Sequence, residues 1–195
     1  MKFLSQIYAN VLVVFAFFWP LFSVPAATIF SDGFENGLST DWQVGDANLA
    51  GTPAYWAVVD SAFGGELTHG GTNKVYCAGV GFGGTTVAPK YQDSMSAYLL
   101  RSIDLTSYTN ATLSFWFKIP SIEATYDFAH VYMDQTEIWT RDATATSWTQ
   151  TNLSLSGFVG GVHTLKFEFT SDTSVTNEGW YLDDIAVTDA YTPGP

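Results

Sequence analysis

The chain has 195 residues, of which 47% are hydrophobic and 13% are charged, and its formal net charge is −12 at pH 7. Lys2 is the only charged residue among the first 26, so removing that segment would take the net charge from −12 to −13. Such an acidic protein repels nucleic-acid phosphates and anionic lipids, which argues against both as partners.

The first 26 residues have the layout of a secretory signal peptide. Lys2 gives a positive start, VLVVFAFFW at 11–19 is apolar, and SVPAA ends in small residues, so we expect cleavage after Ala26. An uncleaved anchor is the alternative, but a membrane span needs about 20 apolar residues and this run is shorter. We therefore expect a protein that is secreted, extracellular or on the cell surface, with no membrane partner after cleavage.

Residues 27–190 are expected to form one domain, followed by a flexible tail at 191–195. A chain of this length can bury a sizeable core. Cys77 is the single cysteine, so no internal disulfide can form, and its apolar surroundings, KVYCAGVG, predict a buried and inert thiol. In the absence of disulfides, a bound metal ion would be an alternative means of stabilising the fold.

Apolar and polar residues alternate along most of the chain, and helical periodicity is nearly absent. In the segment 111–119, for example, Leu113, Phe115 and Phe117 share one face, as expected for a half-buried strand. The expected strands are residues 28–31, 55–60, 73–79, 96–102, 111–119, 127–133, 136–141, 147–154, 163–170 and 179–188. About ten such strands predict an all-β fold, a two-sheet antiparallel β-sandwich of the jelly-roll type. The Gly-rich segments 61–72 and 80–95 are expected to be long loops, where binding sites usually lie.

The last expected strand contains GWYLDDIAV, with two aspartates where strands are depleted in Asp. Strict alternation places Asp183 on the core face with Ile185, and Asp184 on the opposite face with Trp180 and Leu182. A carboxylate that faces a core is costly unless it is paired or bound to a metal ion. No basic residue lies close in sequence to pair with Asp183, so a cation is the expected partner.

The opening stretch FSDGFENG at 30–37 offers the other half of such a site. Asp32 and Glu35 are hard oxygen ligands on a loop that Gly33 lets turn back, and calcium binds six to eight oxygens. If the first and last strands pair, Asp32 and Glu35 come beside Asp183 and Asp184. The alternative is that these acids are solvated turn residues, with Asp32 capping the turn at Gly33.

Three stretches together resemble a known group of domains: FSDGFENGLSTDW, LTSYTNATLSFWFKI and FEFTSDTSVTNEGWYLDDIAV. They resemble the MAM-like jelly-roll domains of bacterial secreted proteins, such as immune inhibitor A-type peptidases, and the calcium-bearing jelly-roll carbohydrate-binding modules. The resemblance covers roughly residues 28–188 and implies a structural calcium held by Glu35 and Asp183, with Asp32 and Asp184 beside them. Asp127 in TYD and Asp172 in TSD also stand in motif-like positions, and the resemblance leaves open whether either contacts the metal. The chain lacks the cysteines of vertebrate MAM domains.

No catalytic motif is evident. The sequence contains neither HExxH nor G-x-S-x-G, and His69, His130 and His163 are scattered. His163 shares a face with Leu165, and His130 alternates with core-like residues in the same way, so neither is expected to act as a base. We expect no enzyme activity; a small glycan-active enzyme of the jelly-roll type is the remaining catalytic alternative.

Aromatic residues supply the remaining functional signal. Alternation places Trp116 and Trp139 on polar faces, where an indole can stack on a sugar ring while its neighbours bind hydroxyls. Tyr55, Trp56 and Tyr91, in or beside the long loops, could extend such a platform. The alternative for each of these side chains is packing in the core or beneath a loop.

The sequence thus predicts a secreted, non-catalytic, calcium-stabilised β-sandwich that binds extracellular carbohydrate. A structural or adhesive surface protein is the alternative. In that case the sandwich would make protein–protein contacts or self-assemble into a polymer, with no sugar involved.

Overall fold

The computed structural model describes residues 26–48 and 50–189, and nearly all of its secondary structure is strand. The expected leader, except for Ala26, and the tail at 191–195 lie outside the described residues. The elements are β1 (Ala27–Asp32), β2 (Gln43–Asp46), β3 (Tyr55–Asp60), the 3-10 helix η1 (Phe63–Gly65), β4 (Asn73–Val80), β5 (Gly83–Thr85), β6 (Ala88–Lys90), β7 (Ser96–Asp104), β8 (Thr112–Ile119), β9 (Phe128–Met133), β10 (Thr136–Arg141), β11 (Ala145–Ser154), the 3-10 helix η2 (Ser156–Phe158), β12 (Val162–Thr170) and β13 (Tyr181–Asp189). Within the described ranges, no helix is long and apolar enough to cross a membrane.

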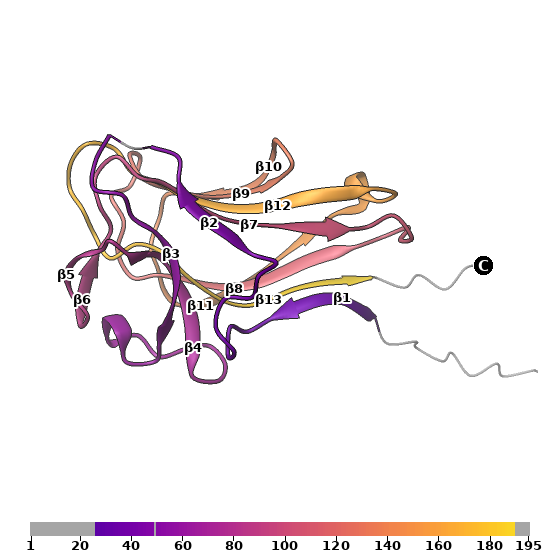
Figure 1. The fold of residues 1–195 in the computed structure, drawn as a ribbon, viewed down its shortest axis with the longest axis horizontal. Coiled ribbons are helices and arrows are strands. Elements are labelled where there is room, and N and C mark those ends of the chain that lie inside the picture. The colour runs from indigo at the N-terminus through magenta and orange to yellow at the C-terminus, as the bar shows by residue number, and fades with distance from the viewer. Residues whose placement is uncertain (1–25, 49, 190–195) are drawn as a thin grey trace, which may run out of the picture.

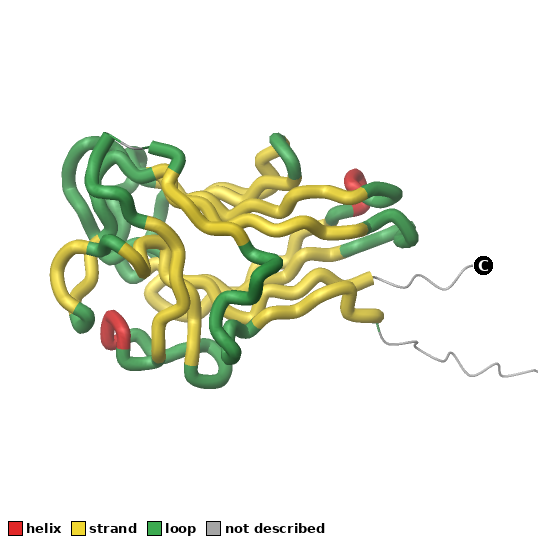
Figure 2. The backbone as a smooth tube through the Cα atoms, viewed as in Figure 1, coloured by secondary structure: helices red, strands yellow, loops and turns green. Residues whose placement is uncertain are grey.

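The strands form two stacked sheets and one small hairpin (Figures 1 and 2). The six-stranded sheet has the order β11-β8-β13-β4-β3, with β1 also paired to β13, and the five-stranded sheet has the order β10-β9-β12-β7-β2. Strands β5 and β6 pair only with each other, and every pairing is antiparallel. The predicted two-sheet antiparallel β-sandwich is confirmed.

All ten strands expected from alternation are present, with ends shifted by at most two residues. Strands β2, β5 and β6 carry no such signal, because they have only four, three and three residues. The predicted loop 80–95 therefore contains the β5–β6 hairpin, and the predicted loop 61–72 contains η1.

The core lies between the two sheets and is rich in aromatic rings. Phe115 and Phe117 of β8 face Phe167 of β12, and all three side chains are at most 1% exposed. Trp180 lies among them, with its ring centroid 5.2 Å from that of Trp56 and 5.8 Å from that of Trp139. These large rings bury much of the apolar area that stabilises the sandwich.

The first and last strands are neighbours, as predicted. Strand β1 pairs with β13 from Ala27 opposite Asp189 to Asp32 opposite Ile185. Figure 1 shows the two strands side by side at the margin of the lower layer. The pairing brings the opening loop, which follows Asp32, beside the Asp183–Asp184 pair.

A β-bulge in β13 changes the faces predicted for its residues. Leu182 pairs with Phe117, and Val187 pairs with Leu113, so both side chains point into the core. Between them the register shifts, and Asp184 has a positive φ of 45°. The extra residue lets the strand keep apolar side chains inward on both sides of the bulge.

The prediction that Asp183 faces the sandwich core was wrong. Asp183 pairs with Trp116, whose side chain points away from the core, so Asp183 lies on the outer face of the six-stranded sheet. Trp180 and Leu182, predicted to face outward, are fully buried in the core instead. Asp183 is nevertheless 0% exposed, because loop 61–72 covers this face.

Lys74 fastens loop 61–72 to the sheet. Its side chain is 0% exposed, and its ammonium donates hydrogen bonds to the carbonyl oxygens of Asp60 (2.8 Å), Phe63 (3.3 Å) and Glu66 (2.6 Å). Lys118 of β8 forms an ion pair with the Glu66 carboxylate. Loop 61–72 therefore covers the part of the outer face of the six-stranded sheet that contains Lys74, Lys118 and Asp183, and we call this part the covered face.

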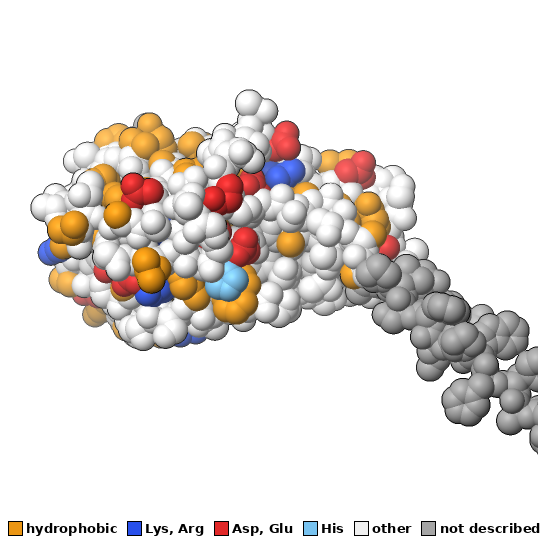
Figure 3. Space-filling view, turned by 90° about the horizontal axis from the view of Figure 1, so that it is seen from below, with side chains coloured by type: hydrophobic (Ala, Val, Ile, Leu, Met, Phe, Trp, Pro, Cys, Tyr) orange, Lys and Arg blue, Asp and Glu red, His pale blue; other side chains and the backbone are white. Residues whose placement is uncertain are grey.

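The thiol of Cys77 is buried, as predicted, and the molecular surface carries more acidic than basic groups, as the net charge implies. Cys77 is buried, and burial raises the pKa of its thiol, so the thiolate is strongly disfavoured. Figure 3, seen from the side of the six-stranded sheet, shows acidic groups spread over the surface and few basic ones.

Candidate functional site

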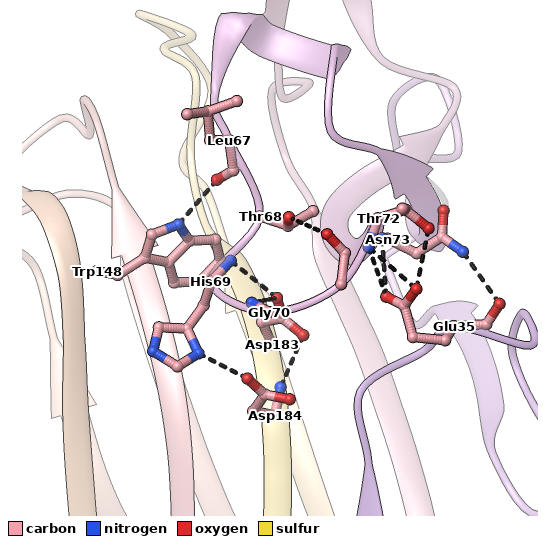
Figure 4. A network of polar contacts seen from close by, with 11 residues as sticks. Glu35, Leu67, Thr68, His69, Gly70, Thr72, Asn73, Trp148, Asp183 and Asp184 are labelled. Carbon is pink, nitrogen blue, oxygen red and sulfur yellow. Dashed lines mark hydrogen bonds and ion pairs between the residues drawn. The ribbon is translucent and has the colours of Figure 1, made fainter.

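Glu35 of the opening loop is bound by the end of loop 61–72 (Figure 4). Its carboxylate accepts hydrogen bonds from the backbone N–H groups of Thr72 and Asn73 at 2.9–3.0 Å, and from the Thr72 hydroxyl at 2.9 Å. These bonds lower the pKa of Glu35. A Cβ at Gly71, whose φ is 56°, would overlap the Glu35 carboxylate, so the approach requires glycine.

Asp183 is bound by the middle of the same loop. Its Oδ2 accepts hydrogen bonds from the N–H groups of His69 (3.0 Å) and Gly70 (3.1 Å), and its Oδ1 accepts one from Asp184 (2.8 Å). Burial, the larger effect, raises the pKa of Asp183 to about 6 despite these bonds. The charge of Lys74 acts on Asp183, but the hydrogen bonds of its ammonium go to carbonyl oxygens.

Asp184, the bulged residue, links the two loops. Its Oδ2 lies 2.6 Å from Nδ1 of His69. A Cβ at Gly33 would lie 3.0 Å from its Oδ1, and a Cβ at Gly70 would lie 2.8 Å from its Oδ2. The carboxylate therefore sits between the opening loop and loop 61–72, where glycines leave space for it.

Asp32 holds the start of the opening loop through two hydrogen bonds. Its Oδ1 accepts a hydrogen bond from the Phe34 N–H, and its Oδ2 accepts one from the indole Nε1–H of Trp42, each at 2.8 Å. Arg101 lies over the rings of Phe30 and Trp42, at 4.0 and 5.1 Å from their centroids. Asp32 therefore caps the turn that follows β1, which is the alternative given for it from the sequence.

Three of the four predicted metal ligands thus contact one loop, residues 67–73. They do not form a group whose ligand atoms lie within 4.8 Å of one another; instead, each of the three carboxylates has at least one oxygen within hydrogen-bond distance of this loop. Among the described residues, the one group of three whose ligand atoms lie within 4.8 Å of one another is Glu123, Asp127 and Asp172. Glu35, Asp183 and Asp184 still offer the oxygen chemistry that calcium prefers.

The Glu123–Asp127–Asp172 group joins the loop between β8 and β9, which contains Glu123 and Asp127, to the loop between β12 and β13, which contains Asp172. Asp127 accepts hydrogen bonds from the Tyr91 hydroxyl and from the Asp172 N–H. Burial, with the nearby acids, raises the pKa of Glu123 and of Asp127. Asp127 is fully buried and accepts a hydrogen bond on each of its oxygens, so it connects the loops that carry Tyr91 and Asp172.

Most of the predicted aromatic platform is buried or covered. Trp56 and Tyr91 are each 1% exposed, with Trp56 donating to the Ala97 carbonyl, so their placement on a binding surface was wrong. Trp139 packs against Phe115, Phe117 and Trp180, because a register shift between Glu137 and Trp139 turns it inward. Trp116 does lie on the outer face of its sheet, but His69 stacks on its ring. Tyr55 is half-buried at the start of β3.

The outer face of the five-stranded sheet is different, because none of its central side chains is buried. We define this open face by the outward residues of β7, β9 and β12: Tyr98, Leu100, Phe128, His130, Tyr132, Lys166, Glu168 and Thr170. Register places them in rows across the sheet. Tyr98, Glu168 and His130 form one row, and Leu100, Lys166 and Tyr132 form the next.

Rings and charges on the open face are linked to one another. Along β9, the ring centroids of Phe128 and His130 are 5.6 Å apart, and those of His130 and Tyr132 are 5.7 Å apart. Lys166 lies 4.4 Å from the Tyr132 ring centroid and donates a 2.7 Å hydrogen bond to Glu168. The result is a strip of aromatic rings bordered by hydrogen-bonding groups.

The sequence did contain a signal for this strip. In FAHVYM, the small and aliphatic residues Ala129, Val131 and Met133 are the buried set, which places Phe128, His130 and Tyr132 together on the other face. The sequence analysis grouped His130 with core-like residues and so did not predict the strip. The cause is that aromatic residues occur on both the buried and the exposed faces of strands.

The chain is similar to the K1 cleaved adhesin domain of Lys-gingipain from Porphyromonas gingivalis, with a TM-score of 0.58 and 20% identity over 81% of this chain and 96% of that one. It is also similar to the C-terminal family 22 carbohydrate-binding module of Clostridium thermocellum Xyn10B, with a TM-score of 0.50 and 13% identity over 87% of this chain and 97% of that one. The chain therefore has the fold of adhesin and carbohydrate-binding sandwich domains.

Sequence comparison gives a narrower match. No protein-family model matches the chain. Residues of this chain are 33% identical to Bacillopeptidase F of Bacillus subtilis over 73 residues, which is 37% of this chain and 4% of that protein. The chain thus corresponds to a small part of that relative, and the MAM-like type remains a prediction.

Proposed function

We propose that this chain is a secreted, non-catalytic binding module whose open face recognises extracellular carbohydrate. One observation carries the proposal: the two outer faces of the sandwich differ. Loop 61–72 covers the central part of the face of the six-stranded sheet, where Lys74 and Asp183 are 0% exposed, whereas the central side chains of the open face are all partly exposed.

The chemistry of the open face suits a sugar chain. Sugar rings have apolar C–H faces that stack on aromatic rings, and hydroxyls that bind carboxylate, hydroxyl and imidazole groups. The face offers the first with Phe128, Tyr132 and Tyr98, and the second with Glu168 and His130. Its charged groups are largely paired with one another, which favours a neutral glycan over an acidic one.

The neighbouring structures support a binding role. One is an adhesin domain and another is a carbohydrate-binding module studied for ligand binding in its cleft. A third similar structure contains the CBM22-1 and GH10 modules of a Clostridium thermocellum xylanase complexed with xylohexaose, and this chain covers 30% of it. Their low sequence identity leaves the ligand of this chain to experiment.

The proposal is tested with a glycan array, followed by isothermal titration calorimetry of the best neutral polysaccharide. We expect Tyr132→Ala and Glu168→Gln each to weaken binding about tenfold or more, since losing one stacking or hydrogen-bonding group costs about 1–2 kcal/mol. Tyr126→Ala is the matched control, because Tyr126 is 59% exposed and lies outside the open face. Binding to no glycan, or unchanged binding by both variants, would contradict the proposal.

Calcium is a second part of the proposal. Glu35, Asp183 and Asp184 would hold the ion against residues 67–73, which requires their carboxylates to come closer together than they are in this structure. Asp32 would make no contribution. The supporting observation is a fully buried Asp183 whose pKa is raised to about 6 and which has no cationic hydrogen-bond partner in the described residues. A calcium ion there would offset the cost of burying that charge.

A further inference from the structure

Three loops meet at one end of the open face, where β7 and β9 begin and β12 ends: residues 91–95, 120–127 and 171–180. Hydrogen bonds hold them together. The backbone N–H of Ser94 donates to the Asp172 carbonyl at 2.5 Å, and the backbone N–H of Asp172 donates to Oδ1 of Asp127 at 2.9 Å. Side chains from the three loops therefore lie close together at this end of the sheet.

These loops bring carboxylates together. Glu123, Asp127 and Asp172 each supply a carboxylate oxygen, and the three oxygens lie within 4.8 Å of one another. The charge of Asp93, from the first of the loops, also acts on Glu123 and on Asp127. Four acidic groups therefore share a small volume, and like charges this close repel unless a proton or a cation lies among them.

No basic group balances these charges. Among the residues that the structure describes, no ion pair contains Glu123, Asp127 or Asp172. The charged groups that act on Glu123 and on Asp127 are themselves all acidic. A carboxylate on the open face of the same sheet does have a basic partner, since Glu168 forms an ion pair with Lys166.

The Glu123 carboxylate points separately to a ligand. Its Oε2 is buried and accepts no hydrogen bond from any residue in the described ranges. Burying a carboxylate oxygen without a bonding partner is costly. Asp127 differs, because it is 0% exposed but accepts a hydrogen bond on each oxygen. The unused bonding capacity of Glu123 thus lies beside a fully buried carboxylate, an arrangement that a bound cation would satisfy.

We propose that Glu123, Asp127 and Asp172 bind a calcium ion at this end of the open face. The group contains carboxylate oxygens and neither His nor Cys, which selects a hard cation over zinc or copper. Calcium takes six to eight oxygens in a flexible geometry, so irregular loops suit it better than magnesium, which demands a near-ideal octahedron. The ion would join loop 120–127 to loop 171–180.

This site shares no residue with the calcium position proposed for Glu35, Asp183 and Asp184, so the two can fail separately. The test is equilibrium dialysis with radioactive calcium, at neutral pH, on the variant Glu35→Gln/Asp183→Asn. We expect this variant to retain one bound ion, and the further change Glu123→Gln to weaken its binding by about tenfold or more. Asp41→Asn in the same variant is the matched control, because the Asp41 side chain is 69% exposed and should not contribute.

The melting temperature distinguishes a metal ligand from a purely structural residue. In excess chelator, Glu123→Gln should melt no lower than the unmodified chain, because it removes one of several like charges. In calcium it should melt lower than the unmodified chain, because the ion stabilises the folded state. A residue with a structural role alone would lower the melting temperature in both conditions.

Three outcomes would overturn the proposal. Calcium binding that Glu123→Gln leaves unchanged would mean adventitious binding to an acidic surface. A single ion that Glu35→Gln/Asp183→Asn abolishes would assign all binding to the other calcium position. No bound ion in the unmodified chain would overturn both calcium positions.

Discussion

The imidazole of His69 lies flat on the indole of Trp116, with ring centroids 3.7 Å apart and ring planes inclined by 15°. Trp148 holds the same segment by donating a 2.8 Å hydrogen bond from Nε1 to the Leu67 carbonyl. Together these contacts orient the N–H groups of His69 and Gly70 toward Asp183 (Figure 4). Trp116 is therefore part of the support of loop 61–72.

This relationship gives a first prediction. We expect Trp116→Ala to lower the free energy of unfolding by about 1–3 kcal/mol, less than for a fully buried indole, because the ring is half-buried. Urea denaturation measures the change. Glycan affinity of the folded variant should match that of the unmodified chain, since Trp116 lies on the covered face. Lost affinity with unchanged stability would show instead that Trp116 contacts the ligand.

A second prediction concerns calcium. Chelation is expected to lower the melting temperature by roughly 5–10 °C, because an ion at about 100 times its Kd adds about 2.7 kcal/mol. Glu35→Gln and Asp183→Asn should each remove most of this response. Asp32→Asn should retain it, since Asp32 binds Phe34 and Trp42. A melting temperature that neither chelator nor added calcium changes would refute the calcium proposal.

Two errors in reading the sequence have one physical cause. Alternation predicted ten strands and the pairing of β1 with β13, yet it placed Asp183 inward and Trp139 outward. In both strands a register shift breaks the period of two: one between Asp183 and Ala186, the other between Glu137 and Trp139. A shift by one residue exchanges the faces, and nothing in the local sequence marks it.

The candidate sites were predictable to different degrees. The proximity of the opening loop to the Asp183–Asp184 pair was predictable, because it follows from the pairing of the first and last strands. Their contacts with residues 67–73 depend on how a long loop folds over the sheet, which local pattern does not encode. The open face was encoded in FAHVYM, but distinguishing it from the covered face required knowing where loop 61–72 lies.

A third prediction concerns pH. Burial, partly offset by Asp60, Glu66 and Asp183, lowers the pKa of Lys74 to about 8, whereas an unfolded lysine has a pKa near 10.4. Between these values the unfolded chain holds more protons than the native chain, so the free energy of unfolding rises with pH. This contribution is fully present above about pH 10.4 and is lost as the pH falls through about 8.

Lys74→Met isolates that contribution. The difference in free energy of unfolding, unmodified chain minus variant, is expected to rise by up to about 3 kcal/mol between pH 8 and pH 10.4. Urea denaturation at several pH values measures it, and subtracting the variant removes the titration of the tyrosines. A difference that stays constant or falls over this range would mean that the carbonyl cage of Asp60, Phe63 and Glu66 holds the ammonium without a depressed pKa.

The last prediction compares two tryptophans that share one environment. Trp56 and Trp180 pack edge to face and are at most 1% exposed, but the Nε1–H of Trp56 donates to the Ala97 carbonyl at 3.1 Å. The buried Nε1–H of Trp180 has no hydrogen-bond partner among the described residues.

Replacing either Trp56 or Trp180 with Phe removes the same volume, so packing losses should be similar. Trp56→Phe also removes a buried hydrogen bond to the Ala97 carbonyl, whereas Trp180→Phe removes a donor that was already unsatisfied. We expect Trp56→Phe to be the more destabilising by about 1–2 kcal/mol in urea denaturation, and equal losses would contradict this account.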